Sequence, residues 1–557
     1  MIAELCLLLL LGISAQDESA KPSVGSAKSN ESEEQPAKQE PKPKPTANTI
    51  AKPTAKPAAK PAAKPAGKQP ESGQQDTATE GPRSLASRGV IKPLELKLDH
   101  AYGFQEIESA LALIAARAPH LAQLETIGQS AQGQPLLVLT LSDPSGGPAE
   151  EKPAILMLDF SPKGTSFGAE TALAFVQLLL DEAAAEAQLE KDGKPPGQGF
   201  AGLKQATPED LQEALEEYGQ DLTGYLSGSD PRQILRDFTV IIAPALDPDA
   251  RDRAPGEAPG SGVWYDLNFP LGWRPASLRA GAGDYPFSKP ETLALGSYLS
   301  ERSNLALVLG ISSGGKEEFS QGSGQLPWLG AMLPAADREV FRKLEGIGFL
   351  TAQTLARHGE GLRPSEVLAP WASLGSPGGG LFDYAFQRFG IYPVAWSPAP
   401  LASDELVSAS DHLKHSVRAM ALQSVSLLGA LPRVRIEQDV LLELAPGLWQ
   451  LDVAVRNSGV LPTLSSLGEK RRVAGDVRLT LVGAKLLATG LRAGDDAAFQ
   501  VVQLEATGNM VSMGAAILDS GETRWLRLVI EGDKGSSIEL VGRAARGGST
   551  RLKISLN

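Results

Sequence analysis

The residues of this chain that could do catalytic or metal chemistry are few and widely spaced. Two of the five histidines, His412 and His415, stand at i and i+3 on an expected helix, a spacing that can hold a metal ion. No histidine stands in an H-x-x-E or H-E-x-x-H pattern and no third ligand is evident, so we interpret the pair as surface polar residues. The remaining histidines are His100, His120 and His358.

One serine stands in a pattern typical of hydrolases. Residues 310–314 read G-I-S-S-G, which matches G-x-S-x-G with Ser312 in the nucleophile position. That motif needs a strand, a sharp turn and a helix, and the serine needs a histidine to activate it. Here a Gly-rich loop follows the expected strand and no histidine is recognisably placed. A hydrolase acting through Ser312 is therefore kept as an alternative.

The elements that would position these residues can be predicted from hydrophobic spacing. Helical spacing occurs in residues 101–118, 170–184, 290–302, 337–358 and 402–428. Short apolar runs typical of buried strands occupy residues 136–141, 154–158, 238–244 and 305–311. Because strands and helices alternate along the chain, the pattern predicts an α/β fold.

The composition changes near Pro432. Beyond it, runs with a period of two residues dominate, and turn signals such as N-S-G at residues 457–459 separate them. These runs are residues 434–444, 449–455, 477–481, 525–530 and 552–556. The pattern predicts a second, all-β domain with a sandwich architecture over residues 432–557.

Residues 153–170 read P-A-I-L-M-L-D-F-S-P-K-G-T-S-F-G-A-E. This stretch resembles, without gaps, the segment of the M14 zinc carboxypeptidases that carries their H-x-x-E zinc motif. The resemblance extends over about residues 98–428 and implies a carboxypeptidase-like mixed sheet flanked by helices. The blocks that carry it are residues 102–143, 230–249, 262–270, 286–295, 307–315 and 383–395, of which the last resembles the strand leading to the catalytic glutamate.

The same resemblance implies where a zinc site would lie, and this chain departs from the family there. The family's zinc needs two histidines and one glutamate, and those positions fall on Pro162, Thr165 and Ser312. The position of the general base falls on Ser397. We therefore expect no intact catalytic residue and no cofactor, with zinc only if the family activity survives.

The family's substrate-binding residues are also altered. Where the resemblance implies an Asn-Arg pair for the terminal carboxylate, this chain has Asp266 and Leu267, and Asp266 would repel a carboxylate. Aromatic residues at 264, 265 and 396 either fill the space of the lost zinc or form a ligand platform, and we favour filling. The candidate pocket residues are Arg251, Arg253, Asp266, Asn268 and Trp396.

The bulk composition and the N-terminus bear on location and partners. A net charge of −13 and a pI of about 5.1 argue against nucleic acid as a partner. Residues 1–15 resemble a secretory signal, although they carry Glu4 and no lysine or arginine. Removal of that segment would also remove Cys6, the one cysteine, so the mature chain would form no disulfide. Residues 16–94 are Lys-, Pro- and Ala-rich, which favours a disordered, extended spacer.

Together these observations predict four regions: a signal peptide (1–15), a spacer (16–94), an M14 carboxypeptidase-like domain (95–431) and a β-sandwich (432–557). We expect an exported protein, periplasmic, cell-surface or extracellular, without a transmembrane helix in the mature chain. Its expected role is non-catalytic binding or scaffolding, with a peptide, another protein or cell-wall material as ligand. The alternatives are an active zinc metallocarboxypeptidase with a relocated site and the hydrolase using Ser312.

Overall fold

The structure is a computed structural model. It describes residues 95–159, 167–193, 231–251, 262–263, 265–311, 333–357, 380–396, 409–492, 499–501, 509–513 and 517–557. The predicted signal segment, the spacer and the predicted zinc-ligand positions lie outside these described residues.

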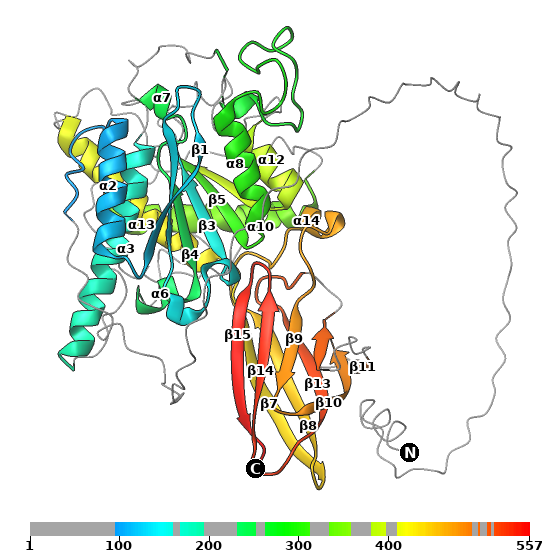
Figure 1. Cartoon of the computed structure of the whole chain (residues 1–557). Coiled ribbons are helices and arrows are strands. Elements are labelled where there is room, and N and C mark those ends of the chain that lie inside the picture. The colour runs from blue at the N-terminus through cyan, green and yellow to red at the C-terminus, as the bar shows by residue number, and fades with distance from the viewer. Residues whose placement is uncertain are drawn as a thin grey trace, which may run out of the picture. The chain divides into compact units, whose positions relative to one another are not determined.

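A six-stranded mixed sheet forms the centre of the N-terminal half of the described chain (Figure 1). Its strand order is β1-β2-β4-β3-β5-β6. The neighbouring strands β4, β3, β5 and β6 pair in parallel. At one side of the sheet, β2 pairs antiparallel with both β1 and β4. The strands are β1 (Ala122–Gln129), β2 (Pro135–Leu141), β3 (Ala154–Leu158), β4 (Thr239–Ala243), β5 (Leu305–Ile311) and β6 (Tyr392–Trp396). The predicted α/β architecture with a mixed sheet is confirmed.

Helices cover both faces of this sheet. They are α2 (Phe104–Arg117), α3 (Gly168–Lys191), α6 (Pro231–Asp237), α7 (Pro248–Arg251), α8 (Pro290–Glu301), α10 (Ala335–Arg357), α12 (Leu381–Phe389) and α13 (Ala409–Ala430). Within the described part of the chain, no helix has both the length and the apolar character needed to cross a membrane.

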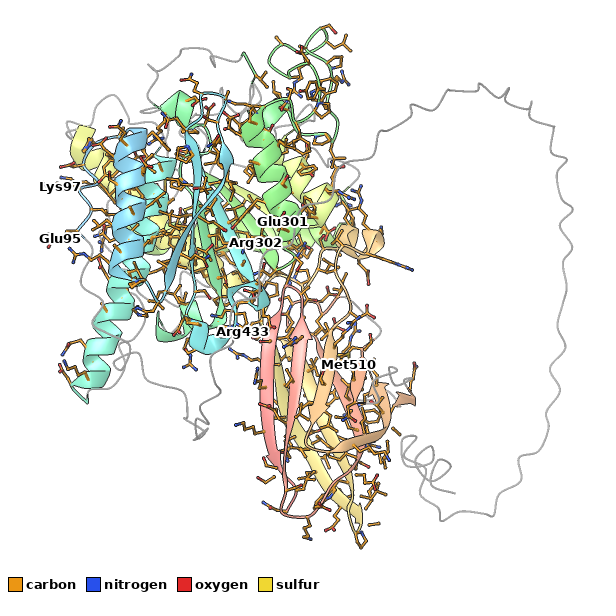
Figure 2. The ribbon with its side chains drawn as sticks, viewed as in Figure 1. Glu95, Lys97, Glu301, Arg302, Arg433 and Met510 are labelled. Carbon is orange, nitrogen blue, oxygen red and sulfur yellow. The ribbon has the colours of Figure 1, made fainter. Side chains whose placement is uncertain are left out.

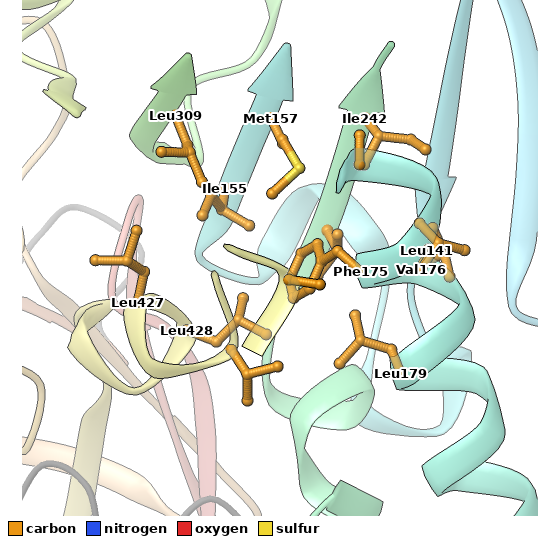
Figure 3. Close-up of a cluster of buried hydrophobic side chains, with 14 of the residues drawn as sticks. Leu141, Ile155, Met157, Phe175, Val176, Leu179, Ile242, Leu309, Leu427 and Leu428 are labelled. Carbon is orange, nitrogen blue, oxygen red and sulfur yellow. The ribbon is translucent and has the colours of Figure 1, made fainter. Parts of the chain in front are cut away.

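The alternation of side chains along β3 explains how one strand serves two cores. Ile155 and Met157 point to the face covered by α3 and α13, where they meet side chains such as Phe175 and Leu428 (Figure 3). Leu156, one residue on, belongs to the core on the opposite face, beneath α8 and α12. Both faces of a parallel strand are buried in this arrangement, which accounts for the continuous apolar run that predicted it.

The block at residues 383–395 differs from the expected single strand. Residues Leu381–Phe389 form helix α12, and the strand β6 starts at Tyr392. Gly390 ends the helix with φ at 64°, in the left-handed region that favours glycine. The block therefore contains a helix, a glycine stop and a strand.

The C-terminal half folds as two antiparallel sheets with an apolar core between them. The first sheet has the order β11-β10-β13-β8-β7 and the second β12-β9-β14-β15. The strands are β7 (Val434–Ala445), β8 (Leu448–Asn457), β9 (Arg478–Val482), β10 (Lys485–Arg492), β11 (Gln500–Val501), β12 (Met510–Ser512), β13 (Thr523–Glu531), β14 (Ser537–Ala544) and β15 (Gly548–Ser555). A short helix, α14 (Ser466–Arg471), interrupts them. The predicted all-β C-terminal architecture is confirmed.

Polar side chains join the sandwich to the α/β half. The Arg546 guanidinium, between β14 and β15, donates to the carbonyl oxygen of Gly390 at 2.6 Å and also to that of Phe389. These carbonyls end helix α12, so Arg546 satisfies groups that the helix leaves unpaired and complements its dipole. Burial lowers the pKa of Arg546 to about 10. Because Arg546 is 3% exposed, this contact is part of a closed interface.

Candidate functional site

The parallel strands β3, β5 and β6 end at one edge of the sheet. Leu158 of β3 pairs with Gly310 of β5, and Ile311 of β5 pairs with Trp396 of β6. Ligands of open α/β sheets bind outside this carboxyl edge, because the connecting loops diverge there. The edge is therefore the candidate site.

The predicted zinc-ligand and base positions follow these strand ends in the sequence. Pro162 and Thr165 come after β3, Ser312 directly after β5 and Ser397 directly after β6. All four lie outside the described residues, and so does Arg253. Trp396 is the last residue of β6, and Asp266 lies within the short helix η4 (Tyr265–Leu267).

Arg251, a predicted pocket residue, is 1% exposed and binds within the protein. Its Nη1 donates to Oδ2 of Asp159 at 3.1 Å, and its Nη2 donates to Oε1 of Glu170 at 2.6 Å. Its Nε donates to the carbonyl oxygen of Tyr102 at 3.0 Å. The guanidinium thus connects the end of β3, the start of α3 and the chain before α2, and its contacts are those of a structural ion cluster.

The two carboxylates of this cluster are held by backbone groups as well. Oδ2 of Asp159 accepts a hydrogen bond from the amide of Ala169 at 3.1 Å, in the first turn of α3. Oε1 of Glu170 accepts one from the amide of Tyr102 at 2.6 Å. Gly168 lies directly against Asp159, since a Cβ at Gly168 would approach Cγ of Asp159 to 2.5 Å. The close approach of helix and carboxylate therefore requires glycine there.

Burial raises the pKa of Glu170, and the attraction of Arg251 opposes that shift. Desolvation is the larger cause, because Glu170 is fully buried. Sequence reasoning missed Asp159 and Glu170 as members of a site. The signal that could have indicated them is a pair of carboxylates flanking the loop between an apolar strand and a helix.

Asn268, a second predicted pocket residue, is also used inside the fold. Its Nδ2 donates to the carbonyl oxygens of Ala282 at 2.8 Å and Tyr285 at 3.1 Å, and to Oγ of Ser288 at 2.8 Å. Its Oδ1 accepts from the amide of Lys289 at 3.0 Å. Its side-chain amide fixes the loop that precedes α8, and it is 0% exposed.

A second buried ion pair lies beside that loop. Nζ of Lys289 donates to Oδ2 of Asp247 at 2.7 Å and lies 4.1 Å from the ring centroid of Tyr265. Tyr265, one of the aromatic substitutions noted above, is 4% exposed and its hydroxyl donates to the carbonyl oxygen of Leu246. Its side chain is therefore packed into the fold and offers little surface to a ligand.

A further buried cation, Lys152, lies just before the N-terminal end of β3. Nζ of Lys152 donates to Oγ of Ser142 at 2.7 Å, to the carbonyl oxygen of Leu235 at 3.1 Å, and to that of Asp143. Lys152 is 2% exposed, and burial lowers its pKa to about 8. Three neutral acceptors coordinate the ammonium, an arrangement that ties β2, β3 and α6 together.

Comparisons with known protein families support the architecture. Residues 107–185, from α2 into α3, match the zinc carboxypeptidase family, and residues 433–555 match a domain of unknown function, DUF8731. This match supports the resemblance of residues 107–185 to the M14 zinc carboxypeptidases. We call the mixed sheet and its helices the M14 domain from here on.

Solved carboxypeptidase structures are similar to this chain at low identity. Carboxypeptidase A from Helicoverpa armigera is 17% identical with a TM-score of 0.36, and the match covers 62% of this chain and 78% of that one. Bovine thrombin-activatable fibrinolysis inhibitor is 14% identical with a TM-score of 0.37, covering 60% and 97%. The metallo-carboxypeptidase from Burkholderia cenocepacia is 14% identical with a TM-score of 0.37, covering 59% and 69%. No curated protein sequence matches the chain.

The M14 family uses zinc, and the side chains at the positions that the resemblance assigns to its ligands would not fit that ion. A zinc site needs imidazole, thiolate or carboxylate donors, whereas Pro162 has no side-chain donor atom and Thr165 and Ser312 carry neutral hydroxyls. Among the described residues, no group of three histidine, cysteine, aspartate or glutamate side chains could hold a metal ion.

Proposed function

We propose that this protein is an exported M14 carboxypeptidase-like protein that has lost zinc peptidase chemistry and acts by binding or scaffolding. The observation that carries the proposal is the set of side chains assigned to the family's metal positions. Pro162, Thr165 and Ser312 replace two imidazoles and one carboxylate. None of the three side chains is of a type that binds zinc in the family's mechanism. A site that had only changed its metal or its geometry would have kept some of these ligands.

The residue at the position of the general base supports the same proposal. Ser397 stands there, and an unactivated hydroxyl cannot accept a proton from water near neutral pH as a glutamate does. Asp266 stands in the position that binds a substrate carboxylate and would repel it. Loss of the ligands, the base and the carboxylate-binding pair together removes the basis for peptide hydrolysis.

The buried residues beneath the carboxyl edge of the sheet are consistent with a rigid surface that binds a ligand and carries out no reaction. Arg251 joins Asp159 and Glu170 in a buried cluster directly under the strand ends. Buried ion pairs are expensive to desolvate, and removing one partner costs much more than the intact pair contributes. A scaffold held this firmly can present a surface to a ligand without carrying out chemistry. The signal-like segment at residues 1–15 supports a location outside the cytoplasm, where a peptide, a protein or cell-wall material would be the ligand.

Metal content and hydrolysis test the proposal together. The purified chain is incubated with zinc, dialysed and measured by mass spectrometry, and its hydrolysis of peptides with free and blocked C-termini is followed. We expect zinc far below one ion per chain and no release of C-terminal residues. The variant Pro162→His/Thr165→Glu/Ser312→His is the matched control, because it restores the ligand types and is expected to retain zinc.

Two outcomes would overturn this proposal. One zinc ion per wild-type chain with chelator-sensitive hydrolysis would establish a metallocarboxypeptidase whose site has moved. Hydrolysis that resists chelators and disappears in Ser312→Ala would establish the serine hydrolase instead.

A further inference from the structure

The outer face of the sheet β11-β10-β13-β8-β7 carries an unusual group of side chains. Along β13, Leu526 and Leu528 point into the sandwich core, so Trp525 and Arg527 lie on the opposite, outer face. Trp525 is half-buried, and Arg456 on the neighbouring strand β8 is exposed. This part of the face therefore reaches solvent.

The outer face is ordered by contacts between arginines and aromatic rings. The Arg492 guanidinium lies 5.0 Å from the ring centroid of Trp525, its cross-strand partner, and 5.0 Å from that of Phe499. Arg527 lies 4.3 Å from the Phe499 ring and binds Asp452 through two hydrogen bonds, at 2.9 and 2.8 Å. The planar groups are thus positioned in advance, which lowers the entropic cost of binding a ligand.

The strand register also places like charges side by side. Arg456 of β8 is directly opposite Arg435 of β7. Asp237 pairs with Arg435 at 2.7 Å and with Arg433 at 3.6 Å. Arg433, which is labelled in Figure 2, directly precedes the first strand of the sandwich. Among the described residues no carboxylate lies within ion-pair distance of Arg456, and Glu437 of β7 lies diagonally across from it on the same face. Like charges in directly opposed positions destabilise a sheet, and such local conflicts are expected where function requires them.

We propose that this face, with Arg456 and Trp525 at its centre, binds an acidic polysaccharide. A half-buried indole offers a flat apolar surface to the ring of a sugar, and an arginine fork matches a carboxylate in bidentate geometry. Around Arg456 and Trp525 the face carries the guanidinium groups of Arg435, Arg456, Arg492 and Arg527 against the carboxylates of Asp237, Glu437 and Asp452, a small positive excess on a chain whose net charge is −13. A polymer with one carboxylate per sugar would satisfy Arg456 and contact Trp525 at once. The site lies on the sandwich and does not depend on the proposal for the M14 domain.

Affinity electrophoresis of the full chain in gels containing polygalacturonate or neutral dextran tests the proposal. We expect retardation by polygalacturonate that weakens as salt increases, and none by dextran. Arg456→Gln and Trp525→Ala should each weaken binding about tenfold, the loss expected from one charge-assisted contact or one stacked ring. Arg456→Gln should leave the melting temperature unchanged or higher, because it relieves the repulsion with Arg435.

The matched control is Arg551→Gln, which removes an exposed arginine from the second sheet of the same domain and should not change binding. The binding result for Trp525→Ala is interpreted only if the circular dichroism spectrum of that variant matches the wild type. If the Trp525→Ala variant does not fold, the binding result for Arg456→Gln still tests the proposal. Lack of retardation by either polymer would refute the proposal, as would equal retardation by dextran. An equal loss in Arg551→Gln would mean that binding reflects overall charge and not this face.

Discussion

Replacing Arg251 should destabilise the protein strongly, because the guanidinium is buried between two carboxylates. Arg251→Met removes the partner of Asp159 and Glu170 and leaves both carboxylates in a site from which water is excluded. Breaking a buried ion pair in this way costs about 3–5 kcal/mol. We therefore expect the free energy of unfolding to fall by about 3–5 kcal/mol near pH 7.5.

The pH dependence of this loss follows from the pKa of Glu170. Burial already raises that pKa in the presence of Arg251, and loss of the cation raises it further. The folded variant then binds a proton that the unfolded chain releases, so the stability of the variant increases as pH falls toward the unfolded pKa. Each carboxyl group contributes at most about 1.4 kcal/mol per pH unit. The deficit against wild type should therefore shrink by about 1–3 kcal/mol between pH 7.5 and 5.5.

Urea unfolding followed by tryptophan fluorescence and circular dichroism measures both effects. Arg338→Met, which removes an exposed arginine from α10, is the matched control and should change stability by less than about 0.5 kcal/mol. Arg251→Met/Glu170→Gln should recover part of the loss, because it removes one of the stranded carboxylates. A loss below about 1 kcal/mol, or a deficit that does not change with pH, would refute the structural role of this ion cluster.

Three further predictions follow from buried contacts. Gly168→Ala should lower the free energy of unfolding by about 1–3 kcal/mol, because the added Cβ would collide with Asp159. Gly475→Ala is the control and should be tolerated, because no atom lies within 4 Å of the added Cβ. Urea titration of both variants measures the difference. Arg546→Met should cost about 1–3 kcal/mol by leaving the carbonyls at the end of α12 unpaired, and an unchanged melting temperature would contradict the interface. Wild-type stability should rise between pH 8 and about 10.4, by at most about 3 kcal/mol, because the folded pKa of Lys152 is about 8 and the unfolded chain binds more protons in that window. Lys152→Met should lack this rise, and a wild-type curve that is flat or falls would count against the buried ammonium.

Local sequence pattern was enough to predict most elements of the M14 domain. The strands β3 and β5 have the boundaries expected from their apolar runs, Ala154–Leu158 and Leu305–Ile311. A buried parallel strand needs apolar side chains on both faces, so its pattern depends little on which elements cover it. The helix α12 was missed because the resemblance assigned its residues to a strand, although its glycine stop at Gly390 is visible in the sequence.

The sandwich shows the limit of the same reasoning. Strand β14 (Ser537–Ala544) was not predicted, since its alternation includes Gly542 and Ala544 at inward positions where small side chains weaken the apolar signal. Gly542 is small because the side chain of Ile436 on β7 occupies the space that a Cβ would take, at 2.6 Å. That requirement comes from a strand more than one hundred residues away along the chain.

The sequence alone predicted the α/β and all-β halves and the resemblance of the first half to the M14 carboxypeptidases, because these depend on short-range patterns and on residue types. It named Arg251 and Asn268 as pocket candidates but could not decide how they are used. Only the tertiary structure brought Arg251 to Asp159 and Glu170, and Arg456 to a position opposite Arg435. The burial of a charge and the identity of its partner depend on which distant segments pack together, and no local spacing carries that information.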